Sequence, residues 1–358
     1  LRLTLTPGIG GETQRKLLAA FGLPEAIFAA GPLAVREVIG SRADTLFDFD
    51  PKEAVHRSIE WASQPGQTII TLGDKNYPAA LLEIPDPPTV LYVRGNAALL
   101  QQRGLAIVGS RNATPLGQQT AENFAKTLAG AGLSIISGLA LGIDGAAHEG
   151  ALEAINEHTR HGVTLAVVGT GLDRVYPKTH RDLAHRIAQH GLIISEYPLG
   201  TPPLMANFPK RNRLIAALAQ GTLVVEAALK SGSLISARLS SEQGKEVFAI
   251  PGSIHAAQSR GCHALIKQGA KLVESAQDVL EELNWPVAGC AAPQTPCQQP
   301  LPDADAVLLE ALGFDPVGLD ALQARTGWPV EQLQAQLMTL EIDGGVARLP
   351  GGLFQRQV

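Results

Sequence analysis

Residues 105–144 read LAIVGSRNATPLGQQTAENFAKTLAGAGLSIISGLALGID, and this stretch decides the fold. Two short runs in it, residues 105–108 and 133–136, are rich in branched apolar side chains, as buried strands are. The segment between them, residues 115–131, carries helix signals: a threonine as N-cap, a proline at its first position and a glycine beyond its end. A strand, a helix and a second strand in this order predict a parallel pair within an α/β sheet.

The same alternation continues on both sides of this stretch. Further apolar runs separated by helical segments occur at residues 68–72, 90–93, 164–168, 192–195, 222–226 and 247–250. This pattern is typical of a sheet with helices on both faces. We therefore expect an α/β, Rossmann-like domain with a mostly parallel sheet over residues 67–284.

A different pattern marks the N-terminal part of the chain. Residues 1–66 read as short helices separated by glycine and proline, which predicts a small helical domain of the SAM or helix-hairpin-helix type. Its opening Pro7-Gly8-Ile9-Gly10 turn has two interpretations. Either its backbone N–H groups face a DNA phosphate, or it is an ordinary tight turn between helices.

A third module is expected after a linker. Residues 285–302 are rich in proline, glutamine and alanine and predict a linker. Three helices and a hairpin then predict a winged helix over residues 303–358, with helices at residues 304–312, 316–326 and 329–340 and hairpin strands at residues 346–349 and 353–357. Its recognition helix, starting near Pro329, carries Glu331 and no lysine or arginine, so we expect it to contact protein rather than DNA.

Composition excludes several classes of protein. The chain has 358 residues, 45% of them apolar, enough to fill the cores of two or three domains. It has three irregularly spaced cysteines, Cys262, Cys290 and Cys297, which argues against a disulfide framework or a zinc site. No apolar run is long enough for a membrane helix and no signal peptide pattern is visible, so a cytoplasmic protein that binds no membrane and no metal is expected.

Charge is distributed unevenly. The net charge is -5, and the residues from Asp303 onward, with three basic and eight acidic side chains, account for all of it. The stretch from Asp173 to Arg213 contains seven basic residues and three acidic ones. That basic stretch is the candidate for contact with an anionic partner.

Loops of similar composition follow several of the predicted strands. In an open parallel sheet such loops meet at one edge, where glycine permits close approach to an anion, hydroxyl groups donate hydrogen bonds and helix N-termini favour negative charge. We predict a phosphate pocket there, made by Gly109, Ser110, Ser137, Gly138, Gly169, Ser231, Gly232 and Ser233.

The loops do not match the common nucleotide motifs. The first loop reads Gly109-Ser110-Arg111 rather than the G-x-G-x-x-G of dinucleotide-binding domains, and no G-x-x-x-x-G-K-[ST] occurs in the chain. No cofactor is therefore predicted. An arginine in the first loop favours capture of a backbone phosphate instead.

Aromatic residues accompany the basic stretch. Tyr176 precedes Lys178, and Phe208 lies just before Lys210. Cations beside aromatic rings suit single-stranded nucleic acid, whose backbone is anionic and whose bases expose ring faces. Stacking and a core or hinge role remain equal alternatives for both rings.

Five segments taken together resemble the successive motifs of the DNA-processing A (DprA/Smf) family. They are residues 105–111, 137–152, 207–216, 231–237 and 251–252, in that family's order and spacing. The resemblance implies a homodimer that binds single-stranded DNA, protects incoming DNA and loads the recombinase RecA during natural transformation. It further implies that Arg111, Lys178, Lys210, Arg211 and Arg213 contact the DNA, and that the chain is not an enzyme.

The alternative is a nucleotide-binding or nucleotide-hydrolysing enzyme of the same Rossmann-like superfamily. Glu226 or Asp144 would then supply the carboxylate. Asp144 and His148, four residues apart at a helix start, are more readily interpreted as a cap that shapes a loop. The hydrolases also carry a P-G-G-x-G-T-x-x-E loop where this chain has Lys230-Ser231-Gly232-Ser233, so no catalytic residue is predicted.

Overall fold

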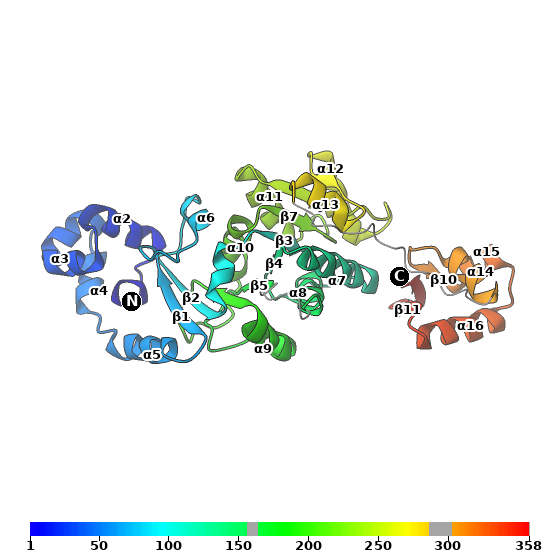
Figure 1. Ribbon diagram of the computed structural model, residues 1–358, viewed down its shortest axis with the longest axis horizontal. Helices are drawn as coiled ribbons and strands as arrows, with labels where there is room; N and C mark the ends of the chain where they lie inside the picture. The colour runs from blue at the N-terminus through cyan, green and yellow to red at the C-terminus, as the bar shows by residue number, and fades with distance from the viewer. Residues whose placement is uncertain (156–163, 286–302, 358) are drawn as a thin grey trace.

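A single sheet, mostly parallel, occupies the middle of the chain. The computed structural model describes residues 1–155, 164–285 and 303–357 (Figure 1). Within those ranges nine strands pair in the order β1-β2-β6-β5-β4-β3-β7-β8-β9. The strands are β1 Gln67–Thr71, β2 Val90–Gly95, β3 Gly104–Val108, β4 Ser134–Ser137, β5 Thr164–Val167, β6 Leu192–Ser195, β7 Gly221–Val224, β8 Glu246–Ala249 and β9 Lys271–Leu272.

Strand direction confirms the predicted fold class. The strands from β3 to β9 run parallel, and β1 and β2 are antiparallel additions at the β6 edge. The runs predicted as strands coincide with β1 to β8. The two-residue β9 was not predicted, because so short a segment carries no periodicity.

Helices cover both faces of the sheet, as Figure 1 shows. Along β3, Leu105 and Ile107 face one layer while Ala106 and Val108 face the other. The first layer contains α5 Lys52–Ala62, α7 Pro115–Gly130, α8 Ile143–Glu153, α9 Arg181–His190 and α13 Ala276–Glu282. The second contains α6 Ala79–Leu82, α10 Asn207–Leu218, α11 Ser233–Glu242 and α12 Arg260–Lys267.

The chain reverses direction within the sheet at β3. From β3 it proceeds through β4 and β5 to β6, then returns to the other side of β3 to form β7 and β8. The loops that follow β3 and β7 therefore turn away from each other and leave a crevice at the carboxyl ends of the strands. Open α/β sheets bind ligands at this position.

The N-terminal residues form a helical module, while α5, which the predicted range 1–66 included, packs on the sheet. The helices of the module are α1 Arg2–Leu5, α2 Gly11–Phe21, α3 Pro24–Ile39 and α4 Arg42–Asp48, around a core that includes Leu17, Ile27 and Val35. No single helix in the described ranges is long and apolar enough to cross a bilayer. The α2 and α3 helices pass that length and composition test only together, across a 92° bend.

An ion-pair network joins this module to the sheet domain. Arg15 of α2 lies 2.6 Å from Asp86, which is 3.2 Å from Arg213 of α10. Arg213 in turn lies 2.7 Å from Glu196, beyond the end of β6. Both members of this last pair are nearly buried, with side chains 13% and 9% exposed. The network therefore fixes the N-terminal module against α10.

The C-terminal module is a winged helix, as predicted. Its elements are α14 Asp303–Leu312, β10 Val317–Gly318, α15 Leu319–Thr326, α16 Val330–Ile342, β11 Val346–Leu349 and β12 Leu353–Arg356. The expected helix over residues 316–326 starts late, because Val317 and Gly318 pair with β12 instead. The predicted linker, apart from Trp285, and the cysteines Cys290 and Cys297 lie outside the described residues.

The contribution of the ion-pair network to stability can be tested. Replacing Glu196 by alanine leaves Arg213 buried beside a single remaining carboxylate, so we expect the free energy of unfolding to fall by roughly 2–3 kcal/mol. Urea unfolding measures this loss. The matched control is Lys52→Ala, which removes an exposed ion pair with Asp50 and should leave the midpoint unchanged. Equal behaviour of the two variants would contradict a structural role for the network.

Candidate nucleic-acid interface

A cavity of about 480 Å³ occupies the crevice between the loops after β3 and β7. Three groups of residues contribute most of its lining: the first loop, the first turns of α10 and the loop leading into α11. They are Gly109, Ser110, Arg111, Asn112, Phe208, Arg211, Asn212, Lys230, Ser231, Gly232 and Ser233. The site thus combines anion-binding loops with cations at the position where this fold binds ligands.

Close backbone contacts set the shape of the cavity. The amide of Ser110 donates to the carbonyl of Glu226 at 2.7 Å, and its own carbonyl accepts from the amide of Ile143 at 3.2 Å. A Cβ at Gly142, whose φ is +76°, would lie 2.2 Å from the Ser110 carbonyl oxygen. Only glycine fits there, so the loops after β3 and β4 and the β7 end form one rigid unit.

Hydrogen-bond donors converge on the cavity from the α11 side. The hydroxyls of Ser231 and Ser233 lie 2.7 Å apart, and the N-terminus of α11, which starts at Ser233, has no side-chain cap. At α7, by contrast, the Glu226 carboxylate accepts from the amide and hydroxyl of Thr114, at 2.9 and 2.6 Å. A carboxylate therefore caps the α7 N-terminus, whereas the first N–H groups of α11 donate to Ser231 and Gly232 in the loop before it. On this side of the cavity the Ser231 and Ser233 hydroxyls and the positive end of the α11 dipole favour an anion.

The exposed cations of the cavity are Arg111 and Lys230. The Arg111 guanidinium lies 5.4 Å from the centre of the Phe208 ring, and the rings of Phe208 and Tyr176 are 5.5 Å apart. Tyr176 is half exposed, and Lys178 begins a short 3₁₀ helix two residues later. A continuous cationic and aromatic surface therefore runs from the cavity towards the loop after β5.

Arg211 does not have the position expected of a DNA contact. Its side chain is 5% exposed, and its Nη1 donates to the carbonyls of Gly138 and Val167. Burial lowers the pKa of its guanidinium to about 10, although Asp144, with a carboxylate 3.8 Å away, acts in the opposite direction. Arg211 forms the floor of the cavity and ties the loops after β4 and β5 together, and its direct contact with DNA stays a prediction.

Arg213 and Lys210 lie on another side of α10. They line a separate hollow of about 170 Å³ next to the N-terminal module. Arg213 is held by Glu196 and Asp86 and does not line the cavity, and its contact with DNA stays a prediction. Lys210 is about half exposed and lies 4.0 Å from Glu196, which leaves its ammonium group accessible.

Three residues of the predicted phosphate pocket have structural roles instead. The Ser137 hydroxyl is fully buried and donates to the carbonyl of Ile107 at 2.6 Å. A Cβ on Gly138 would overlap the Arg211 guanidinium, and the Gly169 carbonyl accepts from the side-chain Nδ2 of Asn207 at 2.9 Å. These residues support the loops and do not line the cavity.

The candidate carboxylates are engaged in holding the loops. Asp144 accepts from the amide of Ala140 at 3.4 Å, in agreement with the cap interpretation. Burial raises its pKa, against the opposing effect of Arg211. Burial likewise raises the pKa of Glu226, against its hydrogen bonds with Thr114. Both carboxylates therefore hydrogen-bond to the loops that they support.

Several lining residues were missed from the sequence. Lys230 directly precedes the predicted Ser231-Gly232-Ser233 loop, and its position beside that loop was the available signal. Asn112 and Asn212 follow predicted basic residues in the same way. Gln258 had no such signal, because it comes from a distant loop and donates to the Asn112 carbonyl at 3.1 Å.

The two cavity arginines should differ in their effect on stability. Arg211→Met removes a buried charge and strands the carbonyls of Gly138 and Val167 and the Asp144 carboxylate, so we expect the free energy of unfolding to fall by about 3–5 kcal/mol. Arg111→Met removes an exposed side chain and should change it by less than about 0.5 kcal/mol. Denaturant titration of both variants is the measurement, and similar losses would contradict the assigned roles.

His148 generates a pH prediction. It is fully buried, its Nδ1 lies 2.6 Å from the Thr164 hydroxyl, and burial lowers its pKa from 6.5 to about 3. Below about pH 6.5 the unfolded chain therefore binds a proton that the folded chain does not, and stability falls as the pH drops. We expect this group to account for a loss of about 1 kcal/mol between pH 7 and 5.5, which His148→Gln should remove from the pH profile of unfolding. Parallel profiles for the two proteins would contradict it.

Comparison with known proteins agrees with this architecture. Residues 68–284 match the family described as DNA recombination-mediator protein A, and residues 292–352 match the DprA winged helix domain. The chain is 42% identical to Protein Smf of Escherichia coli over 308 residues, covering 84% of this chain and 81% of that protein. It is 46% identical to the DNA processing protein DprA of Streptococcus pneumoniae over 253 residues, covering 70% of this chain and 86% of that protein.

Solved structures show the same relationship. The X-ray structure of DprA from S. pneumoniae superposes with a TM-score of 0.68 at 38% identity, covering 78% of this chain and 95% of that one. A structure of DNA processing protein A from Helicobacter pylori superposes with a TM-score of 0.54 at 34% identity, covering 60% of this chain and 95% of that one. That structure is described in terms of its single-stranded DNA binding mode. On these matches the chain belongs to the DNA recombination-mediator protein A (DprA/Smf) family.

Proposed function

We propose that this protein binds single-stranded DNA along the carboxyl edge of its sheet. The observation that carries the proposal is the cavity in which the Ser231 and Ser233 hydroxyls and the α11 N-terminus lie beside exposed Arg111 and Lys230. Such a site favours a phosphate by hydrogen bonding and by charge. The single-stranded DNA binding attributed to the H. pylori relative supports the same assignment.

Each part of the surface has a role in this proposal. A backbone phosphate occupies the cavity, where it accepts from the serine hydroxyls and pairs with Arg111 and Lys230. The Tyr176 and Phe208 rings offer faces for an adjacent base. Lys178 and Lys210 extend the positive surface to either side, while Arg211 holds the floor in place.

The proposed protein is a binder rather than an enzyme. Glu226 stabilises the start of α7, and Asp144 stabilises the loop before α8. With both carboxylates in these roles, the superfamily's hydrolytic chemistry has no assigned base. The nucleotide-enzyme alternative predicts turnover of nucleoside monophosphates, which product chromatography detects.

A cellular role follows from the relatives. We propose that the protein protects incoming DNA and loads RecA in natural transformation, acting as a homodimer. Its relatives named as DNA processing proteins support a role of this kind. In this proposal residues 67–284 bind DNA, residues 1–66 form a helical module, and residues 303–358, beyond a linker at 285–302, contact protein.

Affinity and salt dependence test the DNA site. Arg111→Ala and Lys230→Ala should each weaken binding of a labelled oligonucleotide by about tenfold, and each should reduce the slope of log affinity against log salt by about 0.7, since each removes one phosphate contact. The matched control is Lys52→Ala, an exposed cation of α5, which should change neither quantity. Equal losses in all three variants, or none in any, would contradict the assigned site.

A further inference from the structure

One helix of the winged helix exposes an apolar strip with acidic borders. On α16, Leu333, Leu337 and Leu340 face the module's core. On its outer side Met338 is 65% and Ile342 76% exposed. We define the α16 face as the exposed residues Glu331, Ala335, Met338, Glu341, Ile342 and Asp343.

The charge of this face indicates the chemistry of its partner. The α16 helix contains no lysine or arginine, and the residues from Asp303 onward include eight acidic and three basic side chains. Such a face repels a DNA backbone. It fits a surface that combines cations with exposed apolar groups.

This chain carries such a surface at its own DNA site. We define the DNA rim as the exposed residues Arg111, Tyr176, Lys178, Leu204 and Met205. Leu204 is 51% and Met205 79% exposed, just before α10, and Tyr176 touches the Phe208 ring of that helix. The rim thus combines cations with exposed apolar side chains, and the α16 face combines carboxylates with exposed apolar side chains.

The segment that connects the winged helix to the sheet domain is long enough for the α16 face to reach the DNA rim. Trp285 lies at the opposite edge of the sheet, where its indole N–H donates to the carbonyl of Ala131 beyond the end of α7. The 16 residues of α7 span about 24 Å from there to the cavity edge. The seventeen residues 286–302 reach up to about 56–61 Å when extended.

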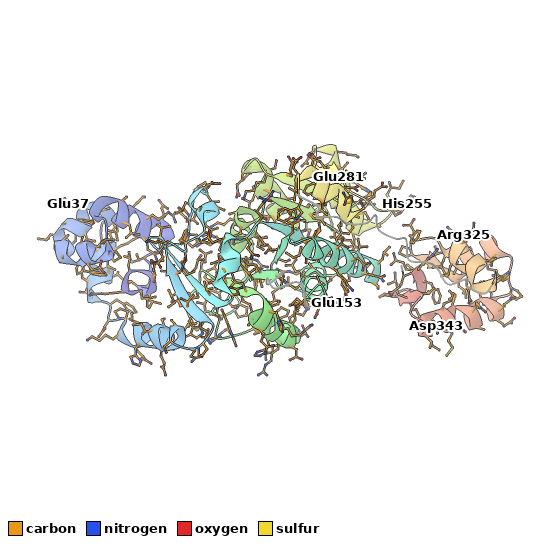
Figure 2. All side chains as sticks on the ribbon, viewed as in Figure 1. Glu37, Glu153, His255, Glu281, Arg325 and Asp343 are labelled. Atoms are coloured by element: carbon orange, nitrogen blue, oxygen red, sulfur yellow. The ribbon has the colours of Figure 1, made fainter. Side chains whose placement is uncertain are left out.

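We propose that the α16 face docks on the DNA rim of the same chain in the absence of DNA. Its carboxylates take the place of phosphates beside Arg111 and Lys178, while Met338 and Ile342 cover the apolar residues. Single-stranded DNA and the winged helix then compete for one surface, and the intramolecular contact lowers the apparent DNA affinity. Figure 1 shows the undocked arrangement, with α16 beyond α7 and Asp343 labelled at its end in Figure 2. The proposal rests on the proposed function, because the rim is the DNA site.

An uncharged double variant of the full chain tests the competition. Met338→Ser with Ile342→Ser weakens docking without changing net charge, so oligonucleotide affinity at low salt should rise five- to tenfold. Val307→Ser, at a half-exposed residue of α14, is the matched control and should leave affinity unchanged. Unchanged affinity in both variants overturns the proposal.

Cross-linking detects docking without DNA. In a full chain with serine at positions 290 and 297, Met205→Cys with Ile342→Cys should form a disulfide within one chain, at a yield independent of protein concentration and suppressed by oligonucleotide. Met205→Cys with Val307→Cys is the control and should not cross-link. A disulfide between copies, or none, overturns the proposal. If no variant binds DNA, the proposed function fails, while the intramolecular disulfide still reports whether the two surfaces meet.

Discussion

The buried charge of Arg211 is the constraint on which the site depends. A guanidinium below the surface needs acceptors on several sides, and these come from the loop after β4, the end of β5 and the start of α8. Each acceptor belongs to a different segment of chain, so satisfying one side chain brings them into one arrangement. The loop glycines then allow the backbones to approach, and a cavity of fixed shape is left above.

Much of the fold was predictable because its signals are local. Strand periodicity, the threonine cap of α7 and the charge pattern of the C-terminal module each depend on residues close in sequence. The site was predictable in part for the same reason: Arg111 and the loop from Ser231 to Ser233 follow strands whose carboxyl ends meet at one edge. Elements of two residues, β9 and β10, carried no such signal.

The other features of the site depend on the orientation of helix α10 and on contacts between residues far apart in the sequence, which local patterns do not contain. Lys210, Arg211 and Arg213 are neighbours in sequence, yet one is accessible, one is buried under the cavity and one is held by carboxylates. The environment of each residue depends on the rotation of α10 about its own axis. Leu214 and Ile215 fix that rotation by packing into the core. Gln258 reaches the cavity from a segment far along the chain. A linear pattern of basic residues contains neither piece of information.

The two-sided use of α10 has a consequence for how this sequence can vary. Successive residues of a helix point about 100° apart, so one helix serves the cavity with Phe208, Arg211 and Asn212 and the N-terminal module with Lys210 and Arg213. An insertion or deletion of a single residue in its first turns would rotate one part of the helix against the other by about 100°, so that Arg211 and Arg213 could not both keep their present acceptors. Over evolutionary time the length of this segment should therefore be held more strictly than the identity of any one side chain on it.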